Sequence, residues 1–402
     1  MIRDRAVLAL LVAETVSSIG SQLSALAIPW FVLVTTGSAT KMGLVLAAEL
    51  IPIAVLGIPS GAVIQRLGPR RTMLLSDFVR APLIALIPLL TIFGVLSFEA
   101  LLVIAALHGL FSMTYFTCQR IILPEVVGEN ERLLGQANSL IEAASNIAGF
   151  LGPMLAGLLI VALGPTSVLW LDAASFAFSF AVIRLFVRVK LRVVTPSEER
   201  PGIWAGLAHL TRDRLIGRAT ISNLLYGFLL RVLFASLPVL AFEEYDRSPV
   251  VAGFLSAAWG AGAIGGSIVA YPLIGRLPPL RLASFASVGI SLPLWLLVPD
   301  LPLPFAGAAL FLSAGAIPIG NAPYLAVLST RVPAALRGKV LQSILTVNSL
   351  LGPLGFAVAG PLFEHVGLHP AYLLVAGLAT IAAINFVLAV RGGDQRGSPQ
   401  PR

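Results

Sequence analysis

Apolar runs of about 20 residues follow one another along the whole chain, separated by short breaks that contain Arg, Gly or Pro. A helix of that length crosses the hydrocarbon core of a bilayer. With 57% hydrophobic and only 11% charged residues, the 402-residue chain has too little polar surface to cover a soluble core. The sequence therefore predicts an all-α polytopic membrane protein.

The apolar runs predict twelve spans. In the first half they lie at about 6–35, 42–64, 71–93, 98–118, 136–162 and 166–188. In the second half they lie at about 218–242, 249–273, 282–299, 303–329, 340–362 and 370–390. An even number of spans places both termini on the same side of the membrane.

The distribution of basic residues indicates which side that is. Of the 27 Lys and Arg, all but four lie at or near the face that holds the termini; the exceptions are Lys41 and Arg247 in opposite loops and Arg80 and Arg231 inside spans. Cytoplasmic loops of membrane proteins are enriched in Lys and Arg, so we expect a cell (inner or plasma) membrane protein with cytoplasmic termini. The net charge of +8 follows from this topology and does not call for a nucleic-acid partner. The single Cys118 excludes an intramolecular disulfide.

The second half of the chain repeats the first. Four glycines match four others at one constant separation: Gly149, Gly152, Gly157 and Gly164 with Gly352, Gly355, Gly360 and Gly367. We expect two parallel six-helix repeats. The predicted domains are an N-terminal bundle over 1–189, a cytoplasmic linker over 190–217 and a C-terminal bundle with a short cytoplasmic tail over 218–402. The linker contains a stretch that is typical of an amphipathic helix on the membrane surface.

This layout resembles the major facilitator superfamily over nearly the whole chain. The family's loop between helices 2 and 3 is matched by Gly61, Gln65, Arg66, Gly68, Arg70 and Arg71, with Gln65 at the position that is acidic in the family. The resemblance implies a cytoplasmic gate, and the loss of the acid implies a lock that rests on hydrogen bonding. Asp77 and Arg80, three residues apart on helix 3, are expected to form an intrahelical pair that belongs to the same gate.

Helix 5 resembles the family's antiporter signature at Ala148, Gly152, Pro153, Ala156 and Gly157. Small residues let helix backbones approach closely, and Pro153 permits a kink. Glu142, Asn146 and Gly149 share this face, so we expect it to place polar contacts and small residues against a partner helix. Plain close packing is the alternative.

Short stretches such as TTGSA (residues 35–39) and LDAASF (171–176) resemble a subgroup of macrolide-efflux transporters, enterobactin exporters and Tap-type multidrug exporters, the Tap type most of all. The resemblance implies export of small, largely apolar molecules, drug-like or siderophore-like, against proton entry by alternating access. It implies no cofactor other than the proton gradient, no catalysis and a monomer. Importers, facilitators or lysophospholipid flippases of the same fold are the alternatives, and a membrane sensor or enzyme is a remote one.

Ionisable residues inside spans are costly and point to functional sites. Ser17, Ser18 and Ser21 fall on the helix face of Glu14 and give helix 1 a polar stripe. A carboxyl group in such a setting can exchange a proton near neutral pH. In the resembled fold, helices 1, 4, 7 and 10 line the cavity, and here they carry Glu14, His108, Arg231 and Asn321. These four predict a substrate and proton site; the alternative is that Glu14 only hydrogen-bonds a neighbouring helix.

The remaining polar residues leave alternatives open. Glu49 is expected either to pair with Arg231, to carry the proton itself or to form a structural ion pair, and Arg231 is expected to have an acidic partner. His108 either titrates or serves as a fixed hydrogen-bonding group. Asn321, with a Gly before it and a Pro after it, is expected to interrupt helix 10.

Two acids and two histidines complete the set of polar residues. Glu142 is expected to join the basic loops, and Asp172 is expected to be structural. His365 and His369 are four residues apart but lack an HExxH pattern, so no metal site is expected.

Overall fold

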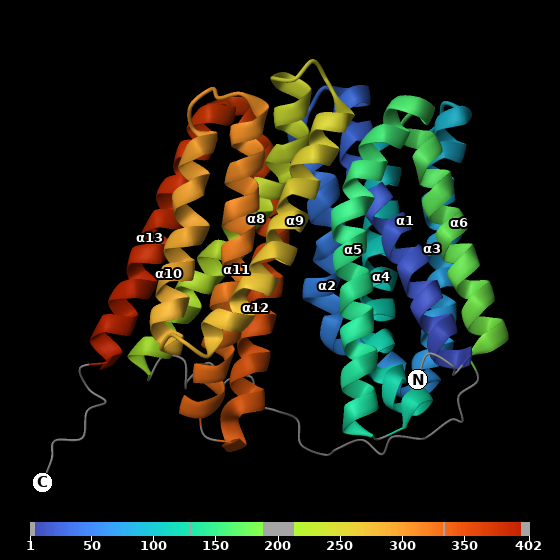
Figure 1. Ribbon diagram of the computed structural model, residues 1–402. Coiled ribbons are helices and arrows are strands. Elements are labelled where there is room, and N and C mark those ends of the chain that lie inside the picture. Colours follow the sequence, from blue (N-terminus) through green and yellow to red (C-terminus); the bar gives the residue numbers. More distant parts are fainter. Residues whose placement is uncertain (1–4, 129, 188–212, 333, 395–402) are drawn as a thin grey trace, which may run out of the picture. The chain divides into compact units, whose positions relative to one another are not determined.

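In the computed structural model the chain forms long α-helices, and no strand occurs in the part it describes, residues 5–128, 130–187, 213–332 and 334–394 (Figure 1). The helices of the first half are α1 (Arg5–Thr36), α2 (Ala39–Leu67), α3 (Pro69–Ile92), α4 (Phe98–Val127), α5 (Glu131–Leu163) and α6 (Pro165–Phe186). Those of the second half are α8 (Arg214–Glu243), α9 (Pro249–Ile274), α10 (Pro279–Ser291), the 3₁₀ segment η1 (Leu292–Leu297), α11 (Leu303–Arg331), α12 (Ala334–Val366) and α13 (Leu368–Asp394).

Eleven candidate spans among the described residues, α10 and η1 together making one of them, are long and apolar enough to cross a membrane. This confirms the predicted all-α membrane fold. Several helices extend beyond the predicted spans, because a helix does not end where the apolar run ends. The largest extension is in α4, predicted over 98–118 and observed over Phe98–Val127.

The breaks between helices have local causes in the sequence. Ser38, Ser97 and Asn130 are N-caps whose side chains accept a backbone N–H of the first turn. The internal repeat is visible at the ends of α5 and α12, where Gly164 (φ +82°) and Gly367 (φ +91°) adopt the same left-handed conformation. That conformation favours glycine, which explains why both halves carry it there.

The prediction that helix 10 is interrupted is wrong, because its backbone stays helical throughout. The corresponding helix, α11, is continuous from Leu303 to Arg331 with Pro318 and Pro323 inside it. Proline is tolerated inside membrane helices where neighbouring groups satisfy the freed carbonyls.

The helices divide into two compact units. Unit 1 contains α1–α6 together with Leu237–Ala257, which is the end of α8, the connecting turn and the start of α9. Unit 2 contains α8 up to Ser236, α9 from Ala258, and α10–α13. The predicted linker falls mostly on 188–212, outside the described residues, so the boundaries of the predicted domains and the surface helix stay predictions.

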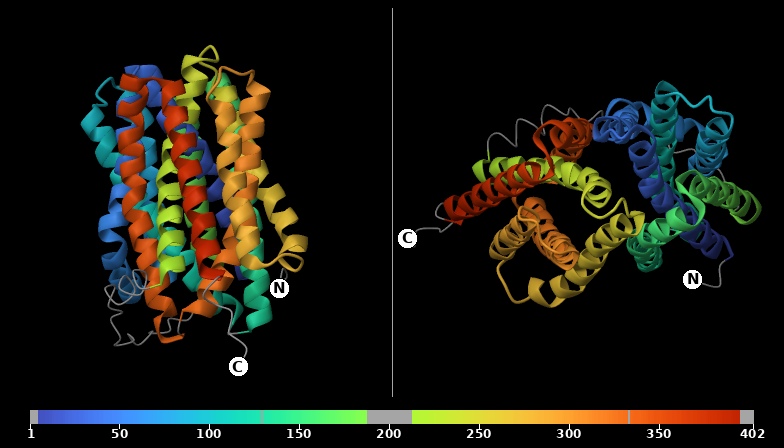
Figure 2. Two further views of the ribbon diagram at one scale, coloured as in Figure 1. Left: turned by 90° about the vertical axis from the view of Figure 1, so that its left-hand side faces the viewer. Right: turned by 90° about the horizontal axis from the view of Figure 1, so that it is seen from above.

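In unit 1, α1 packs against α5 and α6, and α4 packs against α2 and α3 (Figures 1 and 2). Its apolar core joins α1, α2, α3, α4 and α6 around Ala13, Met73, Cys118 and Ile183. In unit 2, α10 packs against α11 and α13. Its core clusters join α8 to α10, α11 and α13, and α8 to α11 and α12.

Candidate functional site

Glu14 lies in the interior of unit 1 with 6% of its surface exposed. Ser18 donates a hydrogen bond to its Oε1 over 2.8 Å, and Ser17 is buried on the same helix. Its other oxygen, Oε2, is buried and has no hydrogen-bond partner among the described residues. The same holds for Nε2 of Gln119 on α4, whose amide lies within interaction range of Glu14. Glu14 and Ser17 of the polar stripe predicted on helix 1 therefore face protein, whereas Ser18 and Ser21 are half-buried.

A second polar cluster joins α3, α4 and α6. Arg80 donates to Oδ1 of Asp77, which confirms the predicted intrahelical pair, and Ser179 on α6 donates to Oδ2 over 2.7 Å. The guanidinium of Arg80 lies 4.3 Å from the ring centroid of Tyr115 and 4.2 Å from that of Phe176. All five groups are buried, so this cluster fixes three helices to one another; its role in a gate stays a prediction.

Glu49 on α2 and His108 on α4 form a third cluster. Oε1 of Glu49 lies 3.1 Å from Nδ1 of His108, and Ser112 lies 3.3 Å from Nε2 of the same ring. The histidine side chain is 6% exposed and the glutamate side chain 31%. A Cβ on Gly109 would lie 1.8 Å from the backbone oxygen of Glu49, so only glycine lets α2 come this close. Three roles were expected as alternatives for Glu49. Its contact with His108 supports an ion-pairing role within unit 1.

Asp172 on α6 is fully buried against α1. Ser24 donates to its Oδ2 over 2.5 Å, and Ser175 donates to its Oδ1 over 3.2 Å. No cation within ion-pair distance of it occurs among the described side chains. Gly20 makes this contact possible, because a Cβ there would lie 2.1 Å from Oγ of Ser175. The expected structural role fits a carboxylate that links α1 to α6.

The antiporter-like helix α5 packs closely at its glycines. A Cβ on Gly152 would lie 2.4 Å from Cβ of Gln22 on α1, and one on Gly157 would lie 2.5 Å from the backbone oxygen of Pro249 in the α9 segment of unit 1. In return, a Cβ on Gly253 would lie 2.5 Å from the backbone oxygen of Pro153. The small residues therefore do bring helix backbones together.

The polar residues on α5 behave differently from the prediction. Glu142 and Asn146 are exposed rather than held against a partner helix. Close packing of α5 on α1 begins only at Gly152, because a Cβ on Gly149 would meet Gln22 at an ordinary 3.7 Å. Glu142 has one contact, 3.8 Å from Arg120 on α4, and both of those side chains are exposed.

The loop between α2 and α3 turns at Gly68 (φ +78°), followed by Pro69 as the first residue of α3. Arg70 donates from Nε to the backbone oxygen of Val187 and from Nη2 to that of Arg184 over 2.9 Å. This loop is thereby attached to the end of α6. Arg66 and Arg71 are exposed, and the side chain of Gln65 and the burial of Gly61 lie outside what the structure describes, so the weaker lock stays a prediction.

Unit 2 carries Arg231 and Asn321, both with exposed side chains. No ion pair of Arg231 occurs among the described residues of this unit; its guanidinium lies 5.8 Å from the ring centroid of Phe356. A Cβ on Gly355 would lie 2.7 Å from Cβ of Arg231, so α12 packs on α8 at this residue. The expected acidic partner is therefore not found within unit 2.

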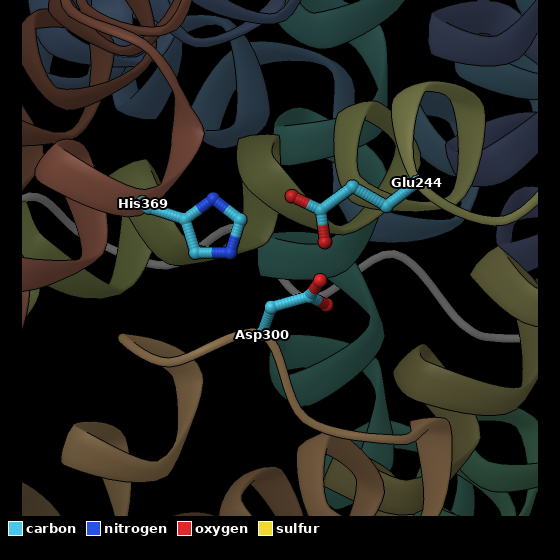
Figure 3. A group of neighbouring side chains, drawn as sticks. All are labelled: Glu244, Asp300 and His369. Atoms are coloured by element: carbon cyan, nitrogen blue, oxygen red, sulfur yellow. The ribbon is translucent and has the colours of Figure 1, made fainter.

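Asp300 and His369 approach each other in unit 2, before α11 and at the start of α13 (Figure 3). Their carboxylate oxygen and imidazole nitrogen lie within 4.8 Å, whereas His365 contacts the backbone oxygen of Pro361. Glu244, also labelled in Figure 3, belongs to unit 1.

Several residues of these clusters were missed by sequence reasoning. Gln119 lies one residue beyond the predicted end of span 4, so its position inside the bundle had no signal. The hydroxyls that bind the buried acids come from other helices and have no pattern of their own: Ser24, Ser175 and Ser179. The glycine next to His108 was the one available signal for a close approach of another helix.

Known proteins show a consistent likeness to this chain. Residues 10–356 match the Major Facilitator Superfamily. The multidrug efflux pump Tap of Mycolicibacterium fortuitum is 29% identical over 384 residues, which is 92% of this chain and 92% of the relative. Tap of Mycobacterium tuberculosis is 26% identical, over 91% of this chain and 89% of the relative.

Solved structures agree at the level of the fold. The nucleoside transporter NupG has a TM-score of 0.77 at 15% identity, covering 96% of this chain and 98% of that one. A bacterial homologue of the iron transporter ferroportin has a TM-score of 0.78 at 14% identity, with the same coverage. Both support two six-helix repeats in a twelve-helix transporter fold.

Proposed function

Because this chain belongs to the Major Facilitator Superfamily, we propose that it is a secondary active exporter that exchanges small, largely apolar molecules for protons by alternating access. Its similarity to multidrug efflux pumps over nine-tenths of its length supports export of drug-like molecules. The observation that best supports proton coupling is the location of the buried carboxylates. Every buried carboxylate among the described residues lies in unit 1: Glu14, Asp77 and Asp172.

Glu14 is the group to which we assign the coupling proton. Asp77 has Arg80 as a partner, and both oxygens of Asp172 accept hydroxyl hydrogen bonds. Glu14 differs, because its Oε2 is buried and accepts no hydrogen bond among the described residues, although the amide of Gln119 lies near it. An ionised carboxylate would hold charge on an unsatisfied oxygen, which is costly, and a proton on that oxygen removes the charge. Loading and release of this proton would thus be coupled to any change in the surroundings of Oε2.

The Glu49–His108 pair is the alternative proton carrier. Histidine changes its charge between pH 5 and 8, and the partly exposed glutamate gives the pair contact with solvent. In this arrangement the proton would be taken up at the imidazole, and Glu14 would only hydrogen-bond its neighbours.

The remaining features of the proposal follow from the sequence. The basic residues place both termini in the cytoplasm, and the protein acts as a monomer in the cell membrane. The proton gradient is the energy source, and no cofactor takes part. Glu14, Ser18, Ser21, Glu49 and His108 of unit 1, with Arg231 and Asn321 of unit 2, are the candidate substrate and proton groups.

The test uses inverted membrane vesicles with ethidium, a largely aromatic cation, as the probe. We expect ethidium to accumulate only when the vesicle lumen is more acidic than the outside, so that protons leave as ethidium enters, and Glu14→Gln to abolish this accumulation at an unchanged amount of protein in the membrane. Accumulation without a gradient, or none in the wild type, would contradict proton-coupled export. If Glu14→Gln kept full activity and Glu49→Gln lost it, the coupling proton would be assigned to the Glu49–His108 pair instead of Glu14.

A further inference from the structure

Helices α10 and α13 of unit 2 lie side by side (Figure 1), and a groove of about 370 Å³ lies between α13 and the helix formed by α10 and η1. Its lining is mostly apolar and includes Val288, Leu292, Ile384 and Leu388. Leu292 is 65% exposed and Ile384 54%, so no described segment of the chain covers them. In a membrane-spanning unit, such an open apolar groove is filled by something other than water.

The polar groups in the middle of the groove are already satisfied. Nε1 of Trp295 donates to Oγ1 of Thr380 over 3.0 Å, and that hydroxyl donates to the backbone oxygen of Ala376 over 2.8 Å. The hydroxyl of Ser291 bonds backbone oxygens one turn earlier. An occupant therefore needs no hydrogen-bonding group along this part of the groove, which favours a hydrocarbon chain.

One end of the groove carries a positive charge. Arg391, in the last turn of α13, lines the groove, is exposed and makes no ion pair among the described residues. Helical rise places it about 16 Å along α13 from Thr380, close to the thickness of one leaflet of a hydrocarbon core of about 30 Å. The groove thus has the length of an acyl chain in one leaflet, with a cation where the headgroup lies.

We propose that this groove binds one anionic phospholipid, with an acyl chain between α10 and α13 and the phosphate on Arg391. A guanidinium binds a phosphate through paired hydrogen bonds, and the net negative charge of the lipid adds attraction at the membrane surface. The 3₁₀ segment η1 presents the Trp295 ring to the chain. This site is independent of the transported substrate and of the proton groups in unit 1.

The test uses Trp295 as the reporter. In the full-length protein, Trp30, Trp170, Trp204 and Trp259 are replaced by Phe, and the protein is reconstituted into phosphatidylcholine vesicles. Brominated phosphatidylglycerol or brominated phosphatidylcholine is then added, because bromine quenches tryptophan on contact. We expect phosphatidylglycerol to reach half-maximal quenching at about a fivefold lower mole fraction, the preference given by one basic residue near the surface.

Two exposed arginines provide the matched comparison. Arg391→Gln should remove the fivefold preference and Arg391→Lys should retain most of it, whereas Arg331→Gln, at the end of α11, should leave it unchanged. Equal quenching by both lipids in the wild type, or a preference that survives Arg391→Gln, would overturn the proposal. A Trp295 that neither lipid quenches would overturn it too, because another protein surface or a second copy then covers the groove.

Discussion

Unit 1 buries carboxylates where unit 2 buries hydroxyls. The acids of unit 2 in the described residues lie in loops or near helix ends: Asp213, Asp300, Glu364 and Asp394. Its interior is linked instead by neutral groups. Tyr226 donates to the backbone oxygen of Ser287 over 3.0 Å, and Tyr372 donates to Oγ of Ser236 over 3.0 Å.

The difference extends to one position that the repeat makes equivalent. Gly152 of α5 and Gly355 of α12 are repeat partners, and each brings its helix onto the first helix of its own half. In unit 1 the residue met there is Gln22; in unit 2 it is Arg231. The duplicated backbone has therefore kept its packing while its polar chemistry has diverged. Proton-dependent behaviour should follow changes in unit 1, whereas changes in the structural hydrogen bonds and helix packing of unit 2 should affect stability without altering that behaviour.

The largest expected effect comes from breaking the buried ion pair of unit 1. Asp77→Ala leaves the buried guanidinium of Arg80 without its carboxylate and should lower the free energy of unfolding by roughly 3–5 kcal/mol. Tyr226→Phe in unit 2 removes a neutral hydrogen bond and should lower it by roughly 1 kcal/mol. Unfolding by dodecyl sulfate titration measures both. Equal losses would show that buried charge and neutral hydrogen bonds contribute alike in this protein.

Substitution of one glycine in each unit distinguishes an effect on helix packing from an effect on proton binding. A Cβ on Gly109 would lie 1.8 Å from the backbone oxygen of Glu49, and one on Gly266 would lie 1.9 Å from that of Gly315. Gly109→Ala and Gly266→Ala should each destabilise by roughly 1–3 kcal/mol through overpacking. Only Gly109→Ala moves Glu49 away from His108. An altered pH profile of ethidium transport in this variant alone would favour the Glu49–His108 pair as the proton carrier, and an unaltered profile in both variants is expected when Glu14 carries the proton.

The control for that pair is Gly149→Ala, whose added Cβ meets Gln22 at an ordinary 3.7 Å. We expect it to leave both the melting temperature and the pH profile unchanged. A shifted pH profile in Gly266→Ala would break the division between a titrating unit and a neutral one.

The smallest effect is expected at the exposed end of unit 1. Glu142 and Arg120 are 3.8 Å apart with side chains more than 60% exposed, and solvent-exposed ion pairs contribute little. Glu142→Gln should therefore leave the melting temperature and transport unchanged within error. A clear loss of transport with normal stability would give Glu142 a contact during the cycle that this structure does not contain.

The sequence was sufficient for the helices and the duplication, because apolar run length and glycine spacing are local properties. Asp77 and Arg80 were paired correctly for the same reason, since both lie on one helix turn. The contacts between helices had no such signal. Glu49 and His108 lie 59 residues apart, and Ser24 and Asp172 lie 148 apart, so their pairing depends on how helices cross. Only a glycine beside each crossing, Gly109 and Gly20, marked where two backbones meet.

Helices α8 and α9 are each divided between the two units. The division in α8 falls between Ser236 and Leu237, next to Pro238, whose ring removes one backbone hydrogen bond of the helix. The division in α9 falls between Ala257 and Ala258, shortly before Gly260 and Gly262. Proline and glycine both weaken a regular helix, so each of these helices can bend where it is divided. The chain thus contains its own pair of mechanical flexures.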